Sequence, residues 1–241
     1  YDAFSLDNTR ETFSDQPGED SQKTSAFAAN LTYQGFDSFT LVALVSSADS
    51  DLVYGYDEDW AYGEYEYNED DWDNDIYNPD PCITPTGCLA DVDGYSYTDY
   101  YFRDKSTQSI ELRALSNRSS KLFNGSTDWV AGFYLKKDDE HLQREYTNSA
   151  KSFSSTFDTK SVAIYGQLDS QLSTQWSLTT GLRLEQRDAD YVKSDGFTDK
   201  LDDTMIGGKF VLSYQHDEDN FWYGSINRGY KAGGVNTNGS L

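Results

Sequence analysis

Three carboxylates stand at alternate positions, Asp71, Asp73 and Asp75, in the most acidic part of the chain. Oxygen ligands at alternate positions are typical of a Ca²⁺ loop. Such a loop needs Gly at its sixth position and Glu at its twelfth, but Ile76 occupies the sixth here and no Glu follows. Two interpretations stay open, a Ca²⁺ site and a solvated acidic loop. Neither interpretation implies that the protein requires a cofactor.

The same stretch, 51–105, is rich in aromatic side chains. It holds ten tyrosines and sixteen acids, opposed by only two cations, so its formal charge is −14. The aromatic richness argues against simple disorder. Aromatic rings with polar partners are common binding surfaces, although loop packing uses the same residues. The candidate ligand-binding residues are Tyr56, Trp60, Tyr65, Tyr67, Trp72, Tyr95 and Tyr97.

Cys82 and Cys88 are the only cysteines and flank a turn-rich pentapeptide. We predict that they form a disulfide, which implies an oxidising compartment. Their spacing alone is a weak metal motif, because His141 and His216 lie far away in the sequence.

The segments that must position these loops read as β-strands. In 161–169 and 175–185 apolar residues recur at every second position, so each strand has one apolar and one polar face. Arg183 falls on the polar face, and we expect it to pair with Glu185 and, by the same pattern, Arg113 to pair with Glu111. The remaining predicted strands are 23–34, 38–50, 106–116, 128–137, 204–215 and 221–230. The facing of the last is ambiguous, because Phe221, Trp222 and Tyr223 are consecutive.

The connections alternate in length. Those at 35–37, 117–127, 170–174 and 216–220 are shorter, and those at 51–105, 138–160 and 186–203 are longer. Aromatics stand beside the shorter ones: Tyr33, Phe39, Trp129, Trp176, Tyr214 and Trp222. This pattern predicts an all-β fold, an antiparallel up-and-down transmembrane β-barrel segment with short periplasmic turns and long extracellular loops. A soluble β-sandwich is the alternative.

The composition argues against several classes of function. The net charge of −23 over 241 residues disfavours a nucleic-acid partner, and no apolar run approaches the ~18 residues of a membrane-spanning helix. No nucleophile elbow or phosphate loop occurs, so we predict that the protein is not an enzyme. The chain opens on Tyr1, which favours a mature or excised segment.

Several motifs, taken together, resemble those of TonB-dependent outer-membrane receptors. They are 227–236 (NRGYKAGGVN), 109–113 (SIELR), 129–134 (WVAGFY), 165–168 (YGQL), 178–183 (LTTGLR) and the loop start 54–60 (YGYDEDW). They run in family order over most of 106–236. The resemblance implies a barrel of about 22 strands, of which we count about eight here, so that 1–241 is a partial β-barrel domain.

The resemblance also implies a function and its partners. Such a receptor lies in the outer membrane of a Gram-negative bacterium and contacts lipid and lipopolysaccharide. It binds a scarce small-molecule ligand, such as an iron-siderophore chelate, and imports it with energy from the TonB system, which contacts a plug and TonB box not found in this sequence. A passive porin-type barrel is the alternative.

Overall fold

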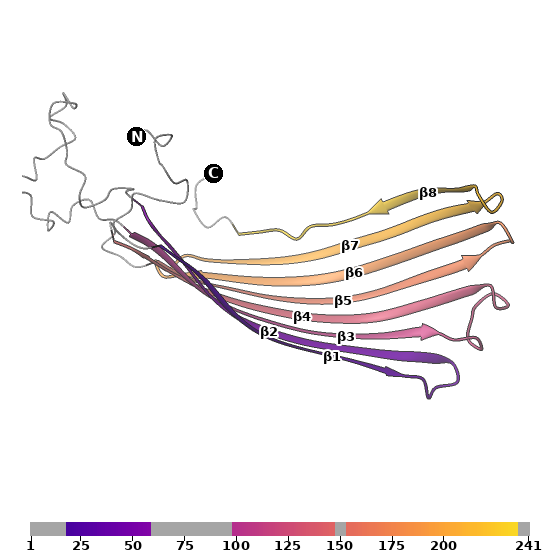
Figure 1. The fold of residues 1–241 in the computed structure, drawn as a ribbon, viewed down its shortest axis with the longest axis horizontal. Coiled ribbons are helices and arrows are strands. Elements are labelled where there is room, and N and C mark those ends of the chain that lie inside the picture. Colours follow the sequence, from indigo (N-terminus) through magenta and orange to yellow (C-terminus); the bar gives the residue numbers. More distant parts are fainter. Residues whose placement is uncertain (1–17, 59–97, 148–152, 236–241) are drawn as a thin grey trace, which may run out of the picture. The chain divides into compact units, whose positions relative to one another are not determined.

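The computed structural model describes residues 18–58, 98–147 and 153–235, and these form eight strands. The strands are β1 (Glu19–Tyr33), β2 (Phe39–Asp57), β3 (Thr98–Ser116), β4 (Thr127–Tyr146), β5 (Phe153–Gln171), β6 (Trp176–Lys193), β7 (Thr198–Gln215) and β8 (Phe221–Arg228). Each strand is hydrogen-bonded to its neighbours in chain order, antiparallel and up-and-down (Figure 1). Within the described ranges no helix is long and apolar enough to cross a bilayer.

The chain divides into two compact units. Unit 1 comprises Tyr1–Gln22, Leu52–Arg103 and Leu142–Ser154. Unit 2 comprises Lys23–Asp51, Asp104–His141 and Ser155–Leu241. Unit 1 therefore holds the ends of β2, β3, β4 and β5 next to 58–97 and 147–152, whereas unit 2 holds the rest of these strands and the whole of β6, β7 and β8.

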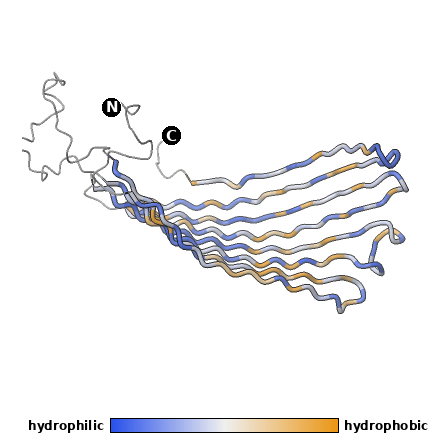
Figure 2. The backbone as a smooth tube through the Cα atoms, in the orientation of Figure 1, coloured by the Kyte–Doolittle hydropathy of each residue, from blue (hydrophilic) through white to orange (hydrophobic). Residues whose placement is uncertain are grey.

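The register of unit 2 confirms the predicted two-faced strands. Ile164 pairs with Leu184, and Leu184 pairs with Ile206 on the next strand. Directly opposed residues share a face of an antiparallel sheet, so apolar side chains form continuous rows across β5, β6 and β7. Figure 2 shows the alternation of hydrophobic and hydrophilic residues along the strands.

The register also settles the facing of β8. Tyr214 pairs with Trp222, and Phe210 pairs with Ile226. Trp222 and Ile226 therefore belong to the apolar face, and Phe221 and Tyr223 to the other. On the interior strands β5 and β6, Ile164 and Leu182 of this apolar face are each 56% exposed, so this face needs an apolar environment to be stable.

Aromatic side chains line the apolar face next to the short turns. The Trp176 and Tyr214 rings lie 4.6 Å apart between centroids, and Tyr214 is directly opposite Trp222. At the β1–β2 turn the Phe36 ring stacks on Phe39 at 4.6 Å. Aromatic rows of this kind suit a membrane–water interface, where one ring edge meets water.

The strands are longer than predicted at the ends that adjoin the long connections. β2 continues to Asp57 and β3 begins at Thr98, so the predicted loop 51–105 was too wide at both ends. The predicted loops 138–160 and 186–203 were also too wide, because β4 ends at Tyr146, β5 starts at Phe153, and β6 and β7 leave only 194–197 between them. The physical reason is that about 9–11 residues cross a bilayer. The strands continue past that length, where neither face needs to be apolar.

Candidate functional site

A carboxylate with no exposed surface, Asp99, lies near the start of β3 in unit 1. Arg144 on β4 binds both of its oxygens, with Nε donating to Oδ1 and Nη2 donating to Oδ2, each at 2.7 Å. The hydroxyls of Tyr101 and Tyr56 donate to Oδ2 at 2.9 and 3.1 Å. We call these four residues the Asp99 cluster. Its buried charge is neutralised by a two-pronged guanidinium contact, the strongest geometry for such a pair.

The cluster shifts the proton affinities of its members. Burial alone would raise the pKa of Asp99, but hydrogen bonds from Arg144, Tyr101 and Tyr56 outweigh it and hold that pKa below its usual value. Burial and the bond to Asp99 raise the pKa of Tyr56 to about 12. The Asp99 carboxylate also raises the pKa of Arg144. At neutral pH the pair is thus a fixed ion pair with two neutral phenols.

Aromatic rings extend the cluster into a groove. Leu52, Tyr54, Tyr56, Tyr101 and Arg103 line a cavity of about 470 Å³, which we call the aromatic groove. The Tyr54 ring lies 5.8 Å from Tyr56 and 6.4 Å from Tyr101 between centroids. The Arg144 guanidinium lies over the ring of Tyr101 at 5.3 Å. The groove itself is lined by three phenol rings and by Arg103, a set of side chains that can stack on a flat ligand and attract negative charge.

The strands position the aromatic groove on one face. Along β2 the even-numbered Tyr54 and Tyr56 alternate with Gly55, and the ring of Tyr100 lies where a Gly55 side chain would be. The even-numbered positions are opposite in phase to the apolar Phe39 and Leu41 on the same strand. The β3 and β4 ends are fixed beside the cluster, because Thr98 N donates to Thr147 Oγ1 at 2.8 Å.

A second cluster of the same residue types lies in unit 2. Arg183 donates to Glu185 Oε2 from Nε at 3.0 Å and from Nη2 at 2.8 Å, and the Tyr230 hydroxyl donates to the same oxygen at 2.8 Å. We call Arg183, Glu185 and Tyr230 the Glu185 cluster. The predicted Arg183–Glu185 pair is confirmed. Arg113 lies 3.9 Å from Glu111, close enough for an ion pair but too far for a hydrogen bond.

Tyr165 of β5, whose ring lies over Gly132 of β4, links the Glu185 cluster to β3. A Cβ on Gly132 would overlap the ring of Tyr165, and the Tyr165 hydroxyl donates to Glu111. The Arg183 guanidinium lies over the rings of Tyr134 and Tyr165, at 5.2 and 5.7 Å. Gly132 is thus required by the close approach of a ring from the neighbouring strand, which is a known way to cover a strand glycine.

The structure describes only one of the predicted ligand-binding residues, because the others fall in 59–97, outside the described residues, and the ligand-binding role of all of them stays a prediction. Tyr56 lies in the Asp99 cluster and lines the aromatic groove. Outside the described residues lie Trp60, Tyr65, Tyr67, Trp72, Tyr95, Tyr97, Asp71, Asp73, Asp75, Cys82 and Cys88. The Ca²⁺ site and the disulfide therefore stay predictions. Among the described ranges, no group of three or more His, Cys, Asp or Glu side chains could hold a metal ion.

Sequence reasoning missed Asp99, Tyr101 and Arg144 as parts of a site. Asp99 and Tyr101 are two residues apart in a strand and so share a face, but the sequence pattern places them in a loop, where this spacing carries no meaning. The same pattern places Arg144 in a loop. Recognising that the strands extend past the bilayer would have brought these residues onto one face.

The family model for the β-barrel of TonB-dependent receptor-like proteins matches residues 1–240. The chain belongs to the TonB-dependent receptor β-barrel family. A comparison with curated protein sequences gives no match.

Solved structures of receptors in this family share the fold. The ferric yersiniabactin uptake receptor FyuA of Yersinia pestis is 16% identical over 85% of this chain and 27% of its own length, with a TM-score of 0.59. The ferric citrate transporter FecA, in its unliganded form, is 10% identical over 86% of this chain and 27% of its own, with a TM-score of 0.57. The siderophore receptor PiuA of Acinetobacter baumannii is 13% identical over 85% and 32%, with a TM-score of 0.53. This chain spans about a third or less of their length.

TonB-dependent receptor barrels lie in the outer membrane of Gram-negative bacteria, and this barrel does too. Its apolar face therefore meets lipid, and the soluble-sandwich interpretation was wrong. In such barrels the short turns are periplasmic and the long loops extracellular. β3 has 19 residues, more than the ~9–11 that cross a bilayer, so Asp99, at its loop end, lies beyond the membrane on the extracellular side.

Proposed function

We propose that this protein is an active-transport receptor that binds a scarce extracellular ligand and imports it with energy supplied by the TonB system. The observation that carries the proposal is the aromatic groove, placed by the buried Asp99 cluster on the extracellular ends of β2 and β3. A transporter needs a selective first contact with its ligand outside the membrane. We propose a binding role and no catalytic one.

The chemistry of the groove favours an anionic ligand with flat, conjugated faces, such as an iron-siderophore chelate. The rings of Tyr54, Tyr56 and Tyr101 offer stacking faces, and Arg103 adds a positive charge to the lining. Arginine binds carboxylate-like groups with two parallel hydrogen bonds. The ligands after which the two similar receptors are named, ferric yersiniabactin and ferric citrate, support this class without assigning either to the present protein.

Binding to the full-length protein tests the ligand class. Ferric catecholate, ferric hydroxamate, ferric citrate and haem are titrated against the purified receptor while its intrinsic fluorescence is followed. We expect one class to bind, and Tyr54→Ala and Arg103→Ala each to weaken it about tenfold, equivalent to ~1.4 kcal/mol. Tyr33→Ala is the matched control, because Tyr33 is 50% exposed at a short-turn end and Tyr54 is 45% exposed in the groove.

Cellular uptake tests the energy coupling separately. Cells that express the full-length protein take up the radiolabelled chelate, and we expect uptake to stop when the gene for TonB is deleted. Uptake that persists without TonB would show passive, porin-type diffusion instead. Equal binding by Tyr54→Ala, Arg103→Ala and Tyr33→Ala would remove the aromatic groove from the ligand site.

A further inference from the structure

The segment that follows β8 lies against the polar face of the sheet in unit 2. The β7–β8 pairing ends at Gly208 and Arg228, and Figure 1 shows the chain continuing from there alongside β7. Residues 229–235 include three glycines. We call 229–235 the strap. Two of its residues, Tyr230 and Gly233, contact side chains of β6 and β7.

A glycine of β7 gives the Tyr230 ring its place. A Cβ on Gly207 would come within 2.8 Å of a Tyr230 ring carbon, so the ring lies directly on the β7 backbone. Gly207 is opposite Arg183 in the register. The Tyr230 hydroxyl therefore reaches the Glu185 cluster, where it donates to Glu185 Oε2 and accepts from Arg183 Nε, each at 2.8 Å. These contacts require the strap to lie on β7.

Gly233 lies between two opposite charges. Arg187 of β6 and Asp203 of β7 are directly opposed in the register, and such residues share a face of an antiparallel sheet. The Gly233 N–H donates to Asp203 Oδ2 at 3.0 Å, and its carbonyl accepts from Arg187 Nη1 at 3.3 Å. In the described part of the chain, each charge thus has the Gly233 backbone as its hydrogen-bonding partner in place of the other.

The polar partners of the strap keep a partner if the strap leaves. The Arg187 contact of 3.3 Å is longer than the usual range of about 2.7–3.2 Å, and its acceptor is neutral. Without Gly233, Arg187 and Asp203 can bond directly, and a bond between charged groups is roughly twice as strong as a neutral one. Arg183 keeps Glu185, to which two of its nitrogens donate. Departure also returns backbone freedom to the strap, most of all at its glycines.

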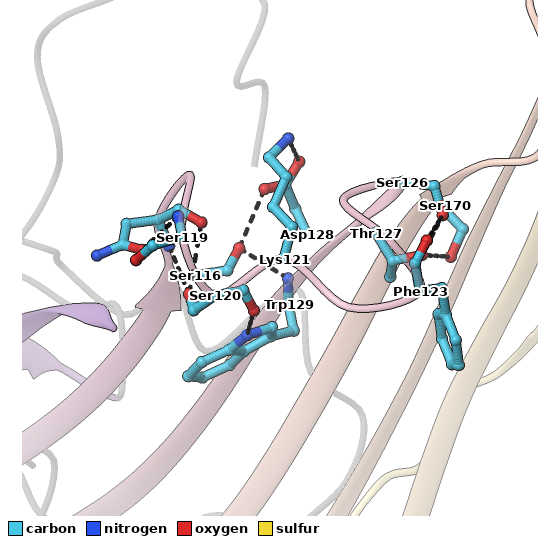
Figure 3. Close-up of polar contacts among 11 residues, drawn as sticks. Ser116, Ser119, Ser120, Lys121, Phe123, Ser126, Thr127, Asp128, Trp129 and Ser170 are labelled. Carbon is cyan, nitrogen blue, oxygen red and sulfur yellow. Dashed lines mark hydrogen bonds and ion pairs between the residues drawn. The ribbon is translucent and has the colours of Figure 1, made fainter. Parts of the chain in front are cut away.

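The short turn between β3 and β4 is fastened differently. Trp129 Nε1 donates to the Ser120 carbonyl at 2.9 Å, and Trp129 N donates to Ser116 Oγ at 3.0 Å (Figure 3). Lys121 Nζ and Ser116 Oγ donate to Asp128 at 2.7 and 3.0 Å. These contacts join the turn to both of the strands that it connects. The strap instead continues from one strand and rests on two others, so it can move without disturbing its own strand.

We propose that the strap is a conformational switch with two positions on the lumen side of the barrel wall. In the docked position the Tyr230 ring lies on Gly207, and Gly233 separates the two opposed charges. In the released position Arg187 and Asp203 form a direct ion pair. Tyr230 then leaves the Glu185 cluster, which opens toward the lumen. The switch is built from residues of unit 2 alone and does not depend on which ligand the receptor transports.

Hydrogen exchange of a peptide covering 229–235 in the full-length protein measures the released fraction. Asp203→Asn is the decisive change, because its amide oxygen still accepts from Gly233 but cannot form an ion pair with Arg187. Losing that ion pair disfavours the released position, so exchange should slow about threefold. Asp202→Asn is the matched control, since Asp202 is on the other face of β7, and it should change exchange by less than about twofold.

The place of Tyr230 has its own test. Tyr230→Phe keeps the ring and removes the hydroxyl, so exchange of 229–235 should rise about threefold. Gly207→Ala displaces the ring and should raise it about tenfold. Gly224→Ala is the control, because a Cβ there has nothing within 4 Å.

Faster or unchanged exchange in Asp203→Asn would overturn the proposal, because Asp203 would then only fasten the strap and no second position would exist. Equal exchange in Gly207→Ala and Gly224→Ala would overturn it too, by showing that Tyr230 does not dock on β7.

Discussion

Two parts of this barrel combine a carboxylate, an arginine and tyrosine hydroxyls in different ways. In the Asp99 cluster both carboxylate oxygens bind Arg144, and the carboxylate has no exposed surface. In the Glu185 cluster a single oxygen, Oε2, accepts from both Arg183 and Tyr230, and the Glu185 side chain is 13% exposed. The same residue types therefore make one closed pair and one open pair.

The difference indicates what each cluster does. A carboxylate removed from water is stable only while its partners remain, so the Asp99 cluster works as a fixed support for the aromatic groove. In the Glu185 cluster, Arg183 also stacks over the rings of Tyr134 and Tyr165, and its guanidinium keeps several kinds of partner. Loss of one contact there leaves the others in place.

The largest expected effect on local stability distinguishes the Asp99 carboxylate from the Glu185 carboxylate. Asp99→Asn leaves the Arg144 charge without its counterion, and we expect the loop ends of β3 and β4 to lose about 2–3 kcal/mol against local opening. Glu185→Gln should cost about 1 kcal/mol, because Arg183 keeps Tyr230 and its ring contacts. Hydrogen exchange of peptides covering 98–103, 142–147 and 181–187 in the full-length protein measures both.

Asp188→Asn serves as the control for the two carboxylate changes, because Asp188 is an exposed residue of β6. Its expected effect is within about 0.5 kcal/mol. Equal losses for Asp99→Asn and Glu185→Gln would show that burial does not distinguish the Asp99 cluster from the Glu185 cluster.

Sequence reasoning was accurate at the short-turn ends of the strands and failed at the loop ends. β3 ends at Ser116, as predicted, and β7 ends at Gln215, as predicted. There one face meets lipid, and the alternation of apolar and polar residues marks it clearly. Beyond the membrane both faces are polar or aromatic, as in the Thr98–Lys105 part of β3. No periodic signal then separates a strand from a loop.

The same limit explains which site residues were found. Arg183 and Glu185 stand two apart in a strand with a clear apolar face, so their pairing could be predicted. Asp99 and Arg144 are partners from different strands, in segments that carried no strand signal. Their contact depends on the β3–β4 register, which one sequence does not specify.

A mutation with an intermediate expected effect on stability tests Gly132, which gives Tyr165 room beside the Glu185 cluster. Gly132→Ala places a methyl group where the Tyr165 ring lies, so the ring must move and its bond to Glu111 must break. We expect a loss of about 1–3 kcal/mol in urea unfolding from lipid vesicles, the usual cost of overpacking. Adding Tyr165→Ala should recover part of that loss, because the two sites are coupled.

Gly224→Ala is the matched control for the glycine change, since nothing lies within 4 Å of a Cβ at that position. It should change stability by less than about 0.5 kcal/mol. If Gly132→Ala and Gly224→Ala behave alike, or if Tyr165→Ala restores nothing, the ring does not hold the position that links β3 to the Glu185 cluster.

The smallest expected effect on stability concerns Tyr56, which belongs to the Asp99 cluster and also lines the aromatic groove. Tyr56→Phe removes one of four hydrogen bonds to Asp99 and should cost about 0.5–1 kcal/mol at neutral pH. The pKa of Tyr56 is raised to about 12 from an ordinary value of 10.0. A raised pKa in the folded state means that the stability from this hydroxyl is complete below pH 10 and is lost as the pH rises from 10 to about 12. Subtracting the tyrosinate titration of Tyr56→Phe from that of the unaltered protein should therefore leave one component with a midpoint near pH 12. Asp99→Asn should move that component to lower pH, because it removes the acceptor charge. A difference component with a midpoint near the ordinary value of 10.0, or one that does not respond to Asp99→Asn, would show that Asp99 does not raise the pKa of Tyr56 and would separate the aromatic groove from the buried carboxylate.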